Sequence, residues 1–233
     1  MTSMEISTST AKATENLAAE PARPPRPPLL PRRLRLTPGQ VEGPYFIASA
    51  PLRNRLFPPS AFLPPAGVSG EEAAAVLAKL PDQIQISGQV LAADCATIAG
   101  ATVSVWVADP HGRYDNQDDA GNPIEIPAEQ QAYRGRIITE ADGHFSFICL
   151  RPGNYFDEGW KLWRPAHIHV KVEAPGFVEL VTQLYFEDDA QNGLDIPGDD
   201  FFQPELVVQL SPGIPIKGLV QKGYFNFVLD AAR

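Results

Sequence analysis

The sequence predicts an all-β fold, an antiparallel β-sandwich with an irregular proline-rich N-terminal segment and one short helix. Three observations support this fold class. Apolar and polar residues alternate with a period of two in several short segments after Pro81, as in strands that bury one face. Clusters of Gly, Pro, Asn and Asp separate these segments, and a single segment has the signals of a helix.

The N-terminal 36 residues form a basic, proline-rich tail in this prediction. They hold six prolines and six Lys or Arg residues against three acidic residues. Proline has no backbone N–H, so such a run cannot supply the donors that a helix or a sheet needs. We therefore expect residues 1–36 to be disordered or polyproline-like, and residues 37–233 to form one sandwich domain.

The domain is predicted to begin with a covering segment, residues 37–80, which stays rich in proline but contains several aromatic and aliphatic anchors. Within this segment we expect a short helix at residues 70–80. Ser69 and Glu72 have the spacing of a capping box, three alanines follow, and Pro81 ends the helix.

The strands begin at residue 83 in this prediction. Ile84 and Ile86 alternate with Gln83, Gln85 and Ser87, so one face of this segment is apolar. Six later segments alternate in the same way or are rich in β-branched and aromatic residues: Val103–Val107, Phe145–Cys149, Ile168–Val172, Val181–Phe186, Glu205–Leu210 and Tyr224–Leu229.

Composition argues against several classes of protein. A formal charge of −9 argues against a nucleic-acid-binding protein, which needs an excess of Lys and Arg. No apolar stretch of about 18 residues is present, so we expect no membrane span, and the N-terminus has no continuous apolar signal segment. We therefore expect a cytoplasmic protein in which Cys95 and Cys149 are buried thiols.

One predicted strand carries two histidines that point to the same side. On a strand, residues two apart share a face, so His167 and His169 project together while Ile168, between them, faces the core. Two imidazoles in this arrangement can occupy neighbouring positions on a metal ion, so the pair indicates a candidate metal site.

Two histidines do not complete a metal site, and the residues alone leave two sets of further ligands open. Carboxylates near the pair would complete a two-His-one-carboxylate Fe(II) site. Tyr114 and Tyr155 lie in predicted turns, but a phenol has a pKa near 10 and binds as phenolate only to a strong Lewis acid such as Fe(III). Packing against a loop is the simpler interpretation of each tyrosine alone. The carboxylates are Asp157, Glu158 and Glu173.

An ordered series of short motifs runs from residue 36 to residue 229. It resembles the intradiol ring-cleavage dioxygenases, the family that contains protocatechuate 3,4-dioxygenase and catechol 1,2-dioxygenase. The sequences of the Trp163–His169 and Thr182–Phe186 motifs are closer to the protocatechuate branch of that family. The motifs are Leu36–Phe46, Gly88–Trp106, Gly112–Tyr114, Tyr133–Thr139, Asp142–Phe147, Arg151–Tyr155, Trp163–His169 and Thr182–Phe186.

The resemblance implies a non-haem Fe(III) site and names its residues. Tyr114 and His167 match the equatorial ligands, and Tyr155 and His169 match the axial ligands, of which Tyr155 also accepts a substrate proton. Two further catalytic positions match the active-site arginine of the family and the glutamine beside it: Arg164 and Gln183.

The implied reaction inserts both atoms of O₂ into a catechol ring and gives a cis,cis-muconate-type product. The substrate, a protocatechuate-like or a simple catechol, stays open, as do a homo- or hetero-oligomeric state and the role of the basic tail. The alternative is a non-catalytic, transthyretin-like β-sandwich binding module, because the pattern of Ser87–Val90 followed by Gly100–Val105 occurs in such sandwiches.

Other conspicuous side chains receive structural interpretations. Glu42 is expected to anchor its loop, and Asp188 and Asp189 to form a solvated turn. Trp106, Trp160 and Trp163 are assigned to sandwich packing, His111 and His144 to the surface, and Arg134 and Arg136 to surface or framework pairing.

Overall fold

The computed structural model describes residues 33–58, 83–159, 161–193, 202–213 and 219–232. The helix predicted at residues 70–80 and residues 1–32 of the predicted tail lie outside this part of the chain. Where the description begins, the backbone N–H of Leu34 donates to the carbonyl of Ala93 at 2.7 Å, so this end of the predicted tail runs along the sandwich. No helix in the described residues is long and apolar enough to cross a membrane.

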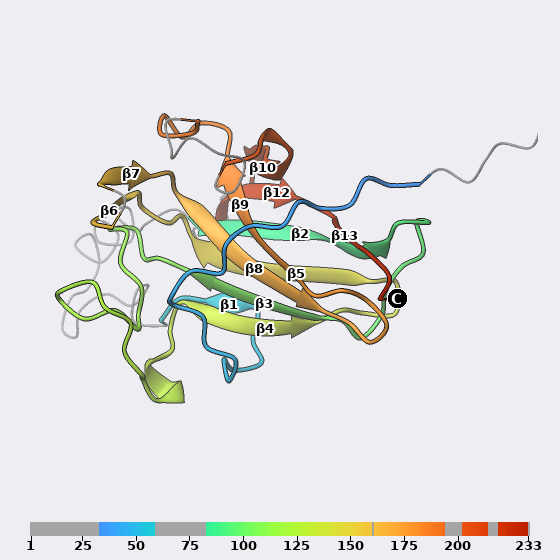
Figure 1. The fold of residues 1–233 in the computed structure, drawn as a ribbon, viewed down its shortest axis with the longest axis horizontal. Coiled ribbons are helices and arrows are strands. Elements are labelled where there is room, and N and C mark those ends of the chain that lie inside the picture. The colour runs from blue at the N-terminus through green and yellow to red at the C-terminus, as the bar shows by residue number, and fades with distance from the viewer. Residues whose placement is uncertain (1–32, 59–82, 160, 194–201, 214–218, 233) are drawn as a thin grey trace, which may run out of the picture. The chain divides into compact units, whose positions relative to one another are not determined.

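Apart from the small two-stranded sheet of β6 and β7, two β-sheets make up the described part of the fold (Figure 1). One has the order β1-β5-β2-β12-β11, with β13 also paired to β2, and the other has the order β10-β9-β8-β3-β4. The described residues also contain two short 3₁₀-helices outside the sheets, η2 and η3. The bounds are β1 (Arg55–Leu56), β2 (Gln83–Ala92), β3 (Thr102–Val107), η2 (Ala128–Gln130), β4 (Arg134–Ile138), β5 (His144–Leu150), β6 (Tyr155–Asp157), β7 (Leu162–Arg164), β8 (His167–Glu173), β9 (Leu180–Phe186), η3 (Pro204–Leu206), β10 (Val207–Val208), β11 (Leu210–Pro212), β12 (Leu219–Tyr224) and β13 (Phe227–Leu229).

The predicted all-β sandwich is confirmed, but its sheets are mixed rather than purely antiparallel. The long central pairs β2–β5, β3–β8 and β8–β9 are antiparallel. In contrast, β1 runs parallel to β5, β10 runs parallel to β9, and both β12 and β13 run parallel to β2. Parallel neighbours need long connections, and each of these strands is separated from its partner by a long stretch of chain.

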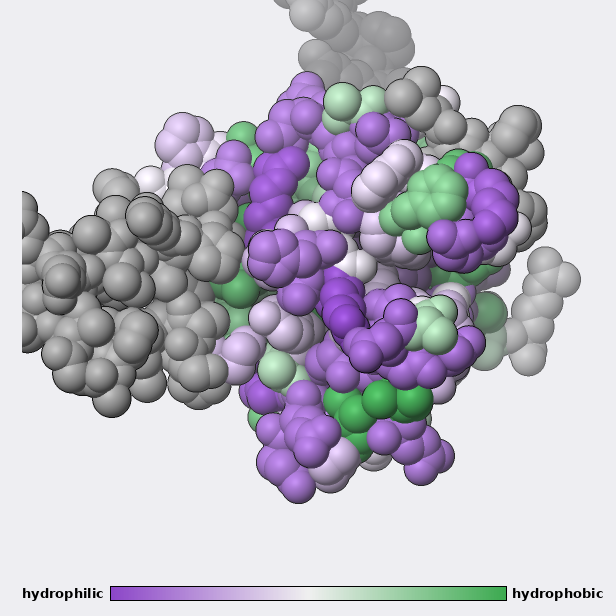
Figure 2. All heavy atoms as spheres, turned by 90° about the vertical axis from the view of Figure 1, so that its left-hand side faces the viewer, coloured by the Kyte–Doolittle hydropathy of each residue, from purple (hydrophilic) through white to green (hydrophobic). Residues whose placement is uncertain are grey.

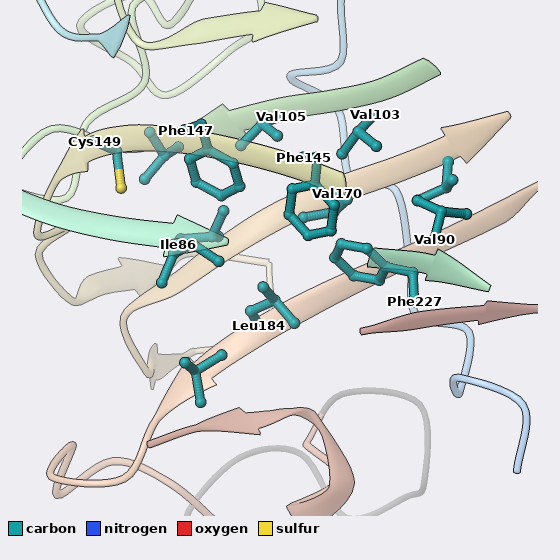
Figure 3. Packing of buried hydrophobic residues seen from close by; sticks show 14 of the residues in the cluster. Ile86, Val90, Val103, Val105, Phe145, Phe147, Cys149, Val170, Leu184 and Phe227 are labelled. Atoms are coloured by element: carbon teal, nitrogen blue, oxygen red, sulfur yellow. The ribbon is translucent and has the colours of Figure 1, made fainter. Parts of the chain in front are cut away.

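The core lies between the two sheets and follows the alternation that predicted the strands. Ile84 and Ile86 of β2 are fully buried. Figure 3 shows side chains of both sheets meeting in this core, and Cys149 lies among them as predicted. The prediction of a buried thiol is wrong for Cys95, which is exposed in the bend that follows β2. The labelled side chains come from β2 (Ile86, Val90), β3 (Val103, Val105), β5 (Phe145, Phe147, Cys149), β8 (Val170), β9 (Leu184) and β13 (Phe227).

A small hairpin, β6–β7, stands at one end of the sandwich (Figure 1). Tyr155 is paired with Arg164, and Phe156 is paired with Trp163. Because neighbouring residues on a strand point to opposite faces, Arg164 is buried on the inner face while Phe156 and Trp163 are 41% and 53% exposed. The two exposed rings contact each other with centroids 5.8 Å apart. The packing predicted for Trp163 inside the sandwich is therefore wrong, whereas Trp106 is buried as predicted.

Candidate active site

The two predicted histidines lie side by side at the start of β8. Both side chains are buried, and their Nε2 atoms are 3.1 Å apart. The Nδ1 atom of His167 lies 2.7 Å from the carbonyl oxygen of Pro165. A carbonyl only accepts, so this contact assigns the proton of His167 to Nδ1 and leaves a lone pair on Nε2, directed at the site.

His169 is held differently from His167. Its Nδ1 atom is buried and has no hydrogen-bond partner among the described residues. Instead, the indole of Trp106 stacks on the imidazole, with ring centroids 4.8 Å apart and an interplanar angle of 8°. Trp106 lies directly opposite His169 in the β3–β8 pairing, so the sheet register itself places the two rings together.

Tyr114 reaches the histidines from the loop after β3. Its hydroxyl lies 3.4 Å from Nε2 of His167, and its ring is buried against that of Tyr45, with centroids 4.3 Å apart. A tight turn precedes Tyr114: the carboxylate of Asp109 accepts hydrogen bonds from the backbone N–H groups of His111 and Arg113, as in an Asx turn.

Tyr155 enters from β6, and its loop packs directly on the Tyr114 loop. A Cβ at Gly112 would lie closer than 3.0 Å to the backbone oxygen of Asn154, and one at Gly153 equally close to the oxygen of Pro110. Only glycine permits such contacts between two backbones. The two phenol rings consequently meet edge to face, with centroids 6.1 Å apart.

Arg164 and Gln183 form the side of the site next to the histidines. Gln183 lies opposite His169 in the β8–β9 pairing, and its side-chain oxygen accepts a hydrogen bond from Arg164 at 3.2 Å. The same oxygen accepts the hydroxyl of Tyr185 at 3.0 Å, while the Gln183 amide donates to the carbonyl of Val41 at 2.9 Å. These contacts hold the buried guanidinium in one place.

Burial controls the protonation of the four potential ligands. It raises the pKa of Tyr155 to about 12 and the pKa of Tyr114 well above its usual value, to which the neighbouring Tyr155 contributes. Burial, together with the positive charge of Arg164, lowers the pKa of His167 to about 3. Burial and the adjacent His167 lower the pKa of His169 well below its usual value. At neutral pH the imidazoles are therefore neutral, which is the form that binds a metal.

The donor set suits a trivalent cation better than the carboxylate alternative does. Two neutral imidazoles and two phenols converge, and loss of both phenolic protons would supply two negative charges to a buried ion. Among the described residues, no group of three His, Cys, Asp or Glu side chains is arranged so that it could hold a metal ion. The two-His-one-carboxylate site considered above therefore lacks its carboxylate, and Glu173 lies at the opposite end of β8 from His167.

The structure thus brings together all six predicted site residues, and it adds side chains that the sequence interpretation did not assign to the site. Tyr45 and Trp106 stack on Tyr114 and His169, respectively. The prediction of a solvated turn is wrong for Asp189, because its carboxylate accepts hydrogen bonds from the segments that precede Tyr155 and His167. The signal for Tyr45 was its position in the first family motif, Leu36–Phe46. The signal for Trp106 was the strand register that places it opposite His169, and the signal for Asp189 was an acidic residue just after β9.

Two structural interpretations are confirmed. Glu42 forms an ion pair with Lys171 at 3.3 Å and so anchors its loop to β8. Arg134 is fully buried, where it pairs with Asp115 and donates to the side chain of Asn116 at 2.6 Å.

Figure 2 looks onto the end of the molecule that carries β6 and β7. The described surface visible there is mostly hydrophilic, with separate hydrophobic areas.

Comparison with known proteins gives a consistent picture. The family model described as Dioxygenase matches residues 70–231. Chlorocatechol 1,2-dioxygenase of Cupriavidus pinatubonensis is 32% identical over 166 residues, which cover 64% of this chain and 58% of that protein. The protocatechuate 3,4-dioxygenase beta chain of Burkholderia cepacia is 34% identical over 112 residues, which cover 47% of each chain. This chain therefore spans less than two thirds of the length of these relatives.

Among solved structures, the dioxygenase domain of a dioxygenase–carbohydrate-binding protein fusion from Streptomyces sp. SirexAA-E is similar over 85% of this chain and 100% of that chain. The TM-score is 0.60 and the sequence identity is 32%.

Proposed function

Because the chain belongs to the intradiol ring-cleavage dioxygenase family, we propose that it is a non-haem Fe(III) enzyme that inserts both atoms of O₂ into a catechol ring. The observation that carries this proposal is the meeting of two buried imidazoles and two phenols at one end of the sandwich. Tyr114, Tyr155, His167 and His169 hold the iron in this proposal. When bound, ferric iron supplies the Lewis acidity that makes a chelated catecholate reactive towards O₂.

The two tyrosines have different roles in the proposal. The Tyr114 side chain is 2% exposed and is stacked on Tyr45, which fits a ligand that stays in place. Tyr155 lies on a short hairpin at the end of the molecule and is only partly buried. A phenolate oxygen is a base that a substrate hydroxyl can protonate. Tyr155 is therefore suited to accept a proton from a substrate hydroxyl.

Arg164 acts on the substrate in this proposal, and Gln183 holds it there. A guanidinium stays protonated throughout the reaction, so it stabilises negative charge that develops on the oxygen atoms of the catechol. Its fixed position means that little reorganisation is needed when that charge appears. Loss of such a donor costs about 3 kcal/mol in the barrier, or a factor of 10²–10³ in rate.

The substrate class follows from the family and not from the residues of the site. We propose a protocatechuate-like or simple catechol, converted to a cis,cis-muconate-type product, and a homo- or hetero-oligomeric protein. The relatives are named for chlorocatechol and for protocatechuate, so the substrates to compare first are catechol, chlorocatechols and protocatechuate.

The test is oxygen uptake by the iron-loaded protein with this panel of catechols, together with the absorbance of the product. We expect one O₂ consumed per catechol and a muconate as product. A yellow semialdehyde would show cleavage outside the two hydroxylated carbons and would contradict the proposal. A protein that turns over none of the catechols and binds no iron would instead favour the non-catalytic, transthyretin-like binding module.

A further inference from the structure

We propose that Asp189 is a positioning residue that fixes two iron ligands, Tyr155 and His167, through the residues immediately before them. This inference rests on the proposed function for the identity of the ligands. Asp189 lies in the turn after β9, three residues beyond the end of that strand, and is partly buried. Neither the family motifs quoted above nor the proposed reaction assigns it a role.

The carboxylate of Asp189 accepts hydrogen bonds from separate segments of the chain. Oδ2 accepts the backbone N–H of Ala166 at 2.8 Å and the side-chain amide of Asn154 at 2.9 Å. Oδ1 accepts the same amide at 3.1 Å and the backbone N–H of Gln191 at 2.9 Å. Ionised acceptors form stronger hydrogen bonds than neutral ones, so the charge of Asp189 matters to this arrangement.

Each of the two segments held by Asp189 leads directly into a proposed ligand. Ala166 immediately precedes His167 at the start of β8, and Asn154 immediately precedes Tyr155 at the start of β6. The Asn154 amide also lies 3.4 Å from the carbonyl oxygen of Arg164, opposite Tyr155 in the hairpin. One carboxylate therefore ties together the starts of β6 and β8, whose side chains must converge within an ångström for the site to bind a metal well.

The neighbouring Asp188 provides a matched control. It has the same charge and lies in the same turn, but its side chain is 64% exposed and pairs with Arg151 at 2.5 Å. No hydrogen bond joins Asp188 to Ala166 or Asn154 among the contacts of the described residues. Replacement of either aspartate by asparagine removes one negative charge from the turn, so a general electrostatic effect would appear in both variants.

The first experiment uses the metal-free protein and does not depend on the proposed function. Hydrogen exchange of backbone amides is measured in wild type, Asp189→Asn and Asp188→Asn. An asparagine at 189 has a single acceptor oxygen and presents an N–H₂ group to the donors of Ala166 and Asn154. We expect exchange to be at least tenfold faster at residues 154–156 and 166–168 in Asp189→Asn, and within twofold of wild type in Asp188→Asn. Equal exchange in the two variants would overturn the positioning role.

The second experiment uses the iron-loaded protein. We expect Asp189→Asn to lower Fe(III) affinity, measured by competition with a chelator, by 10–100-fold, to shift the visible absorption band and to lower kcat more than it raises KM. Asp188→Asn should stay within twofold of wild type in each. Unchanged iron affinity and an unchanged band in Asp189→Asn would contradict the proposal. A wild-type protein that binds no iron would contradict the proposed function, whereas the exchange result would still decide the role of Asp189.

Discussion

The histidines and the tyrosines of the candidate site reach the same place by different means. His167 and His169 are two residues apart on β8, and strand geometry alone points them in one direction. Tyr114 lies in the loop after β3, and Tyr155 lies 41 positions later at the first residue of β6, directly after a loop, so nothing periodic relates them. They meet because two glycines let their loops touch backbone to backbone. The positions of His167 and His169, the strand half of the site, therefore follow from strand geometry. The positions of Tyr114 and Tyr155, the loop half, depend on individual contacts between loops.

The largest effect is expected on the strand half. His167→Ala removes a proposed ligand that is fully buried and held at Nδ1 by the carbonyl of Pro165. We expect loss of bound iron and a fall in kcat/KM of more than about 10³-fold, measured by metal analysis and oxygen uptake. His111→Ala, at an exposed histidine of the Tyr114 loop, is the control. Iron retained in His167→Ala would contradict the ligand assignment.

The contact between the loops that precede Tyr114 and Tyr155 can be disrupted by a substitution that changes neither tyrosine. Gly112 has φ +82°, and a Cβ there would overlap the backbone oxygen of Asn154. Gly121 in the same loop has φ +86°, but the nearest atom to its Cβ would be a flexible side-chain nitrogen of Gln117 at 3.5 Å. We therefore expect Gly121→Ala to lower the free energy of unfolding by about 1–2 kcal/mol, which is the cost of the positive φ alone.

We expect Gly112→Ala to destabilise the protein by a further ~2 kcal/mol relative to Gly121→Ala, because two backbone segments must move apart. Iron affinity should fall in Gly112→Ala and change little in Gly121→Ala. Urea unfolding and chelator competition measure the two effects. Identical losses in both variants would mean that the contact between the loops does not matter to the site.

The stability of the metal-free protein is expected to depend on pH in opposite directions for the histidines and the tyrosines. The pKa of His167 falls from 6.5 to about 3 on folding because burial and Arg164 disfavour its charged form. Between these values the unfolded chain binds more protons than the folded protein. Stability should therefore decrease as the pH falls from about 6.5 towards 3, by up to about 1.4 kcal/mol per pH unit for each such histidine.

Urea unfolding of the metal-free protein at pH 7, 6 and 5 measures this slope, and His167→Gln isolates the contribution of one imidazole. We expect a shallower decline in the variant. On the tyrosine side the sign is reversed, because the raised pKa of Tyr155 makes stability decrease as the pH rises from 10 to about 12. Equal acid slopes for wild type and His167→Gln would show that this imidazole is not buried in its neutral form.

The smallest effect is expected on the outer face of the β6–β7 hairpin. Trp163 is 53% exposed and contacts Phe156, whereas its neighbour Arg164 points into the site. We expect Trp163→Ala to change kcat/KM with catechol by less than about threefold, in contrast to the 10²–10³-fold loss for Arg164→Ala. Steady-state kinetics of both variants test this. A large loss in Trp163→Ala would mean that the outer face takes part in substrate binding.

The same contrast explains what could be predicted from the sequence. Alternation of apolar and polar residues located β2, β3, β5 and β8, and with them the histidine pair. The tyrosines could not be assigned from the residues themselves, because a turn tyrosine has no periodic signature. Their assignment came only from the resemblance to a family. The parallel pairing of β12 and β13 with β2 also escaped prediction, since pairing between strands far apart in the sequence has no local signal.

Asp189 shows the same limit at the level of one side chain. An acid next to another acid in a turn after a strand reads as solvated, and this interpretation is right for Asp188, whose side chain is 64% exposed. Asp189 differs only because the starts of β6 and β8 pass beside it. Hydrogen bonds that join three distant segments are set by the tertiary fold, and no local pattern indicates which of two adjacent carboxylates will make them.

The central claim is that one ferric ion binds between two tyrosines and two histidines. Visible absorption during titration with Fe(III) tests it most directly. We predict a red-brown charge-transfer band that saturates at one equivalent, changes in Tyr155→Phe and is retained in Tyr133→Phe, a control at a half-buried tyrosine outside the site. The absence of such a band, or a band that Tyr155→Phe leaves unaltered, would contradict the account.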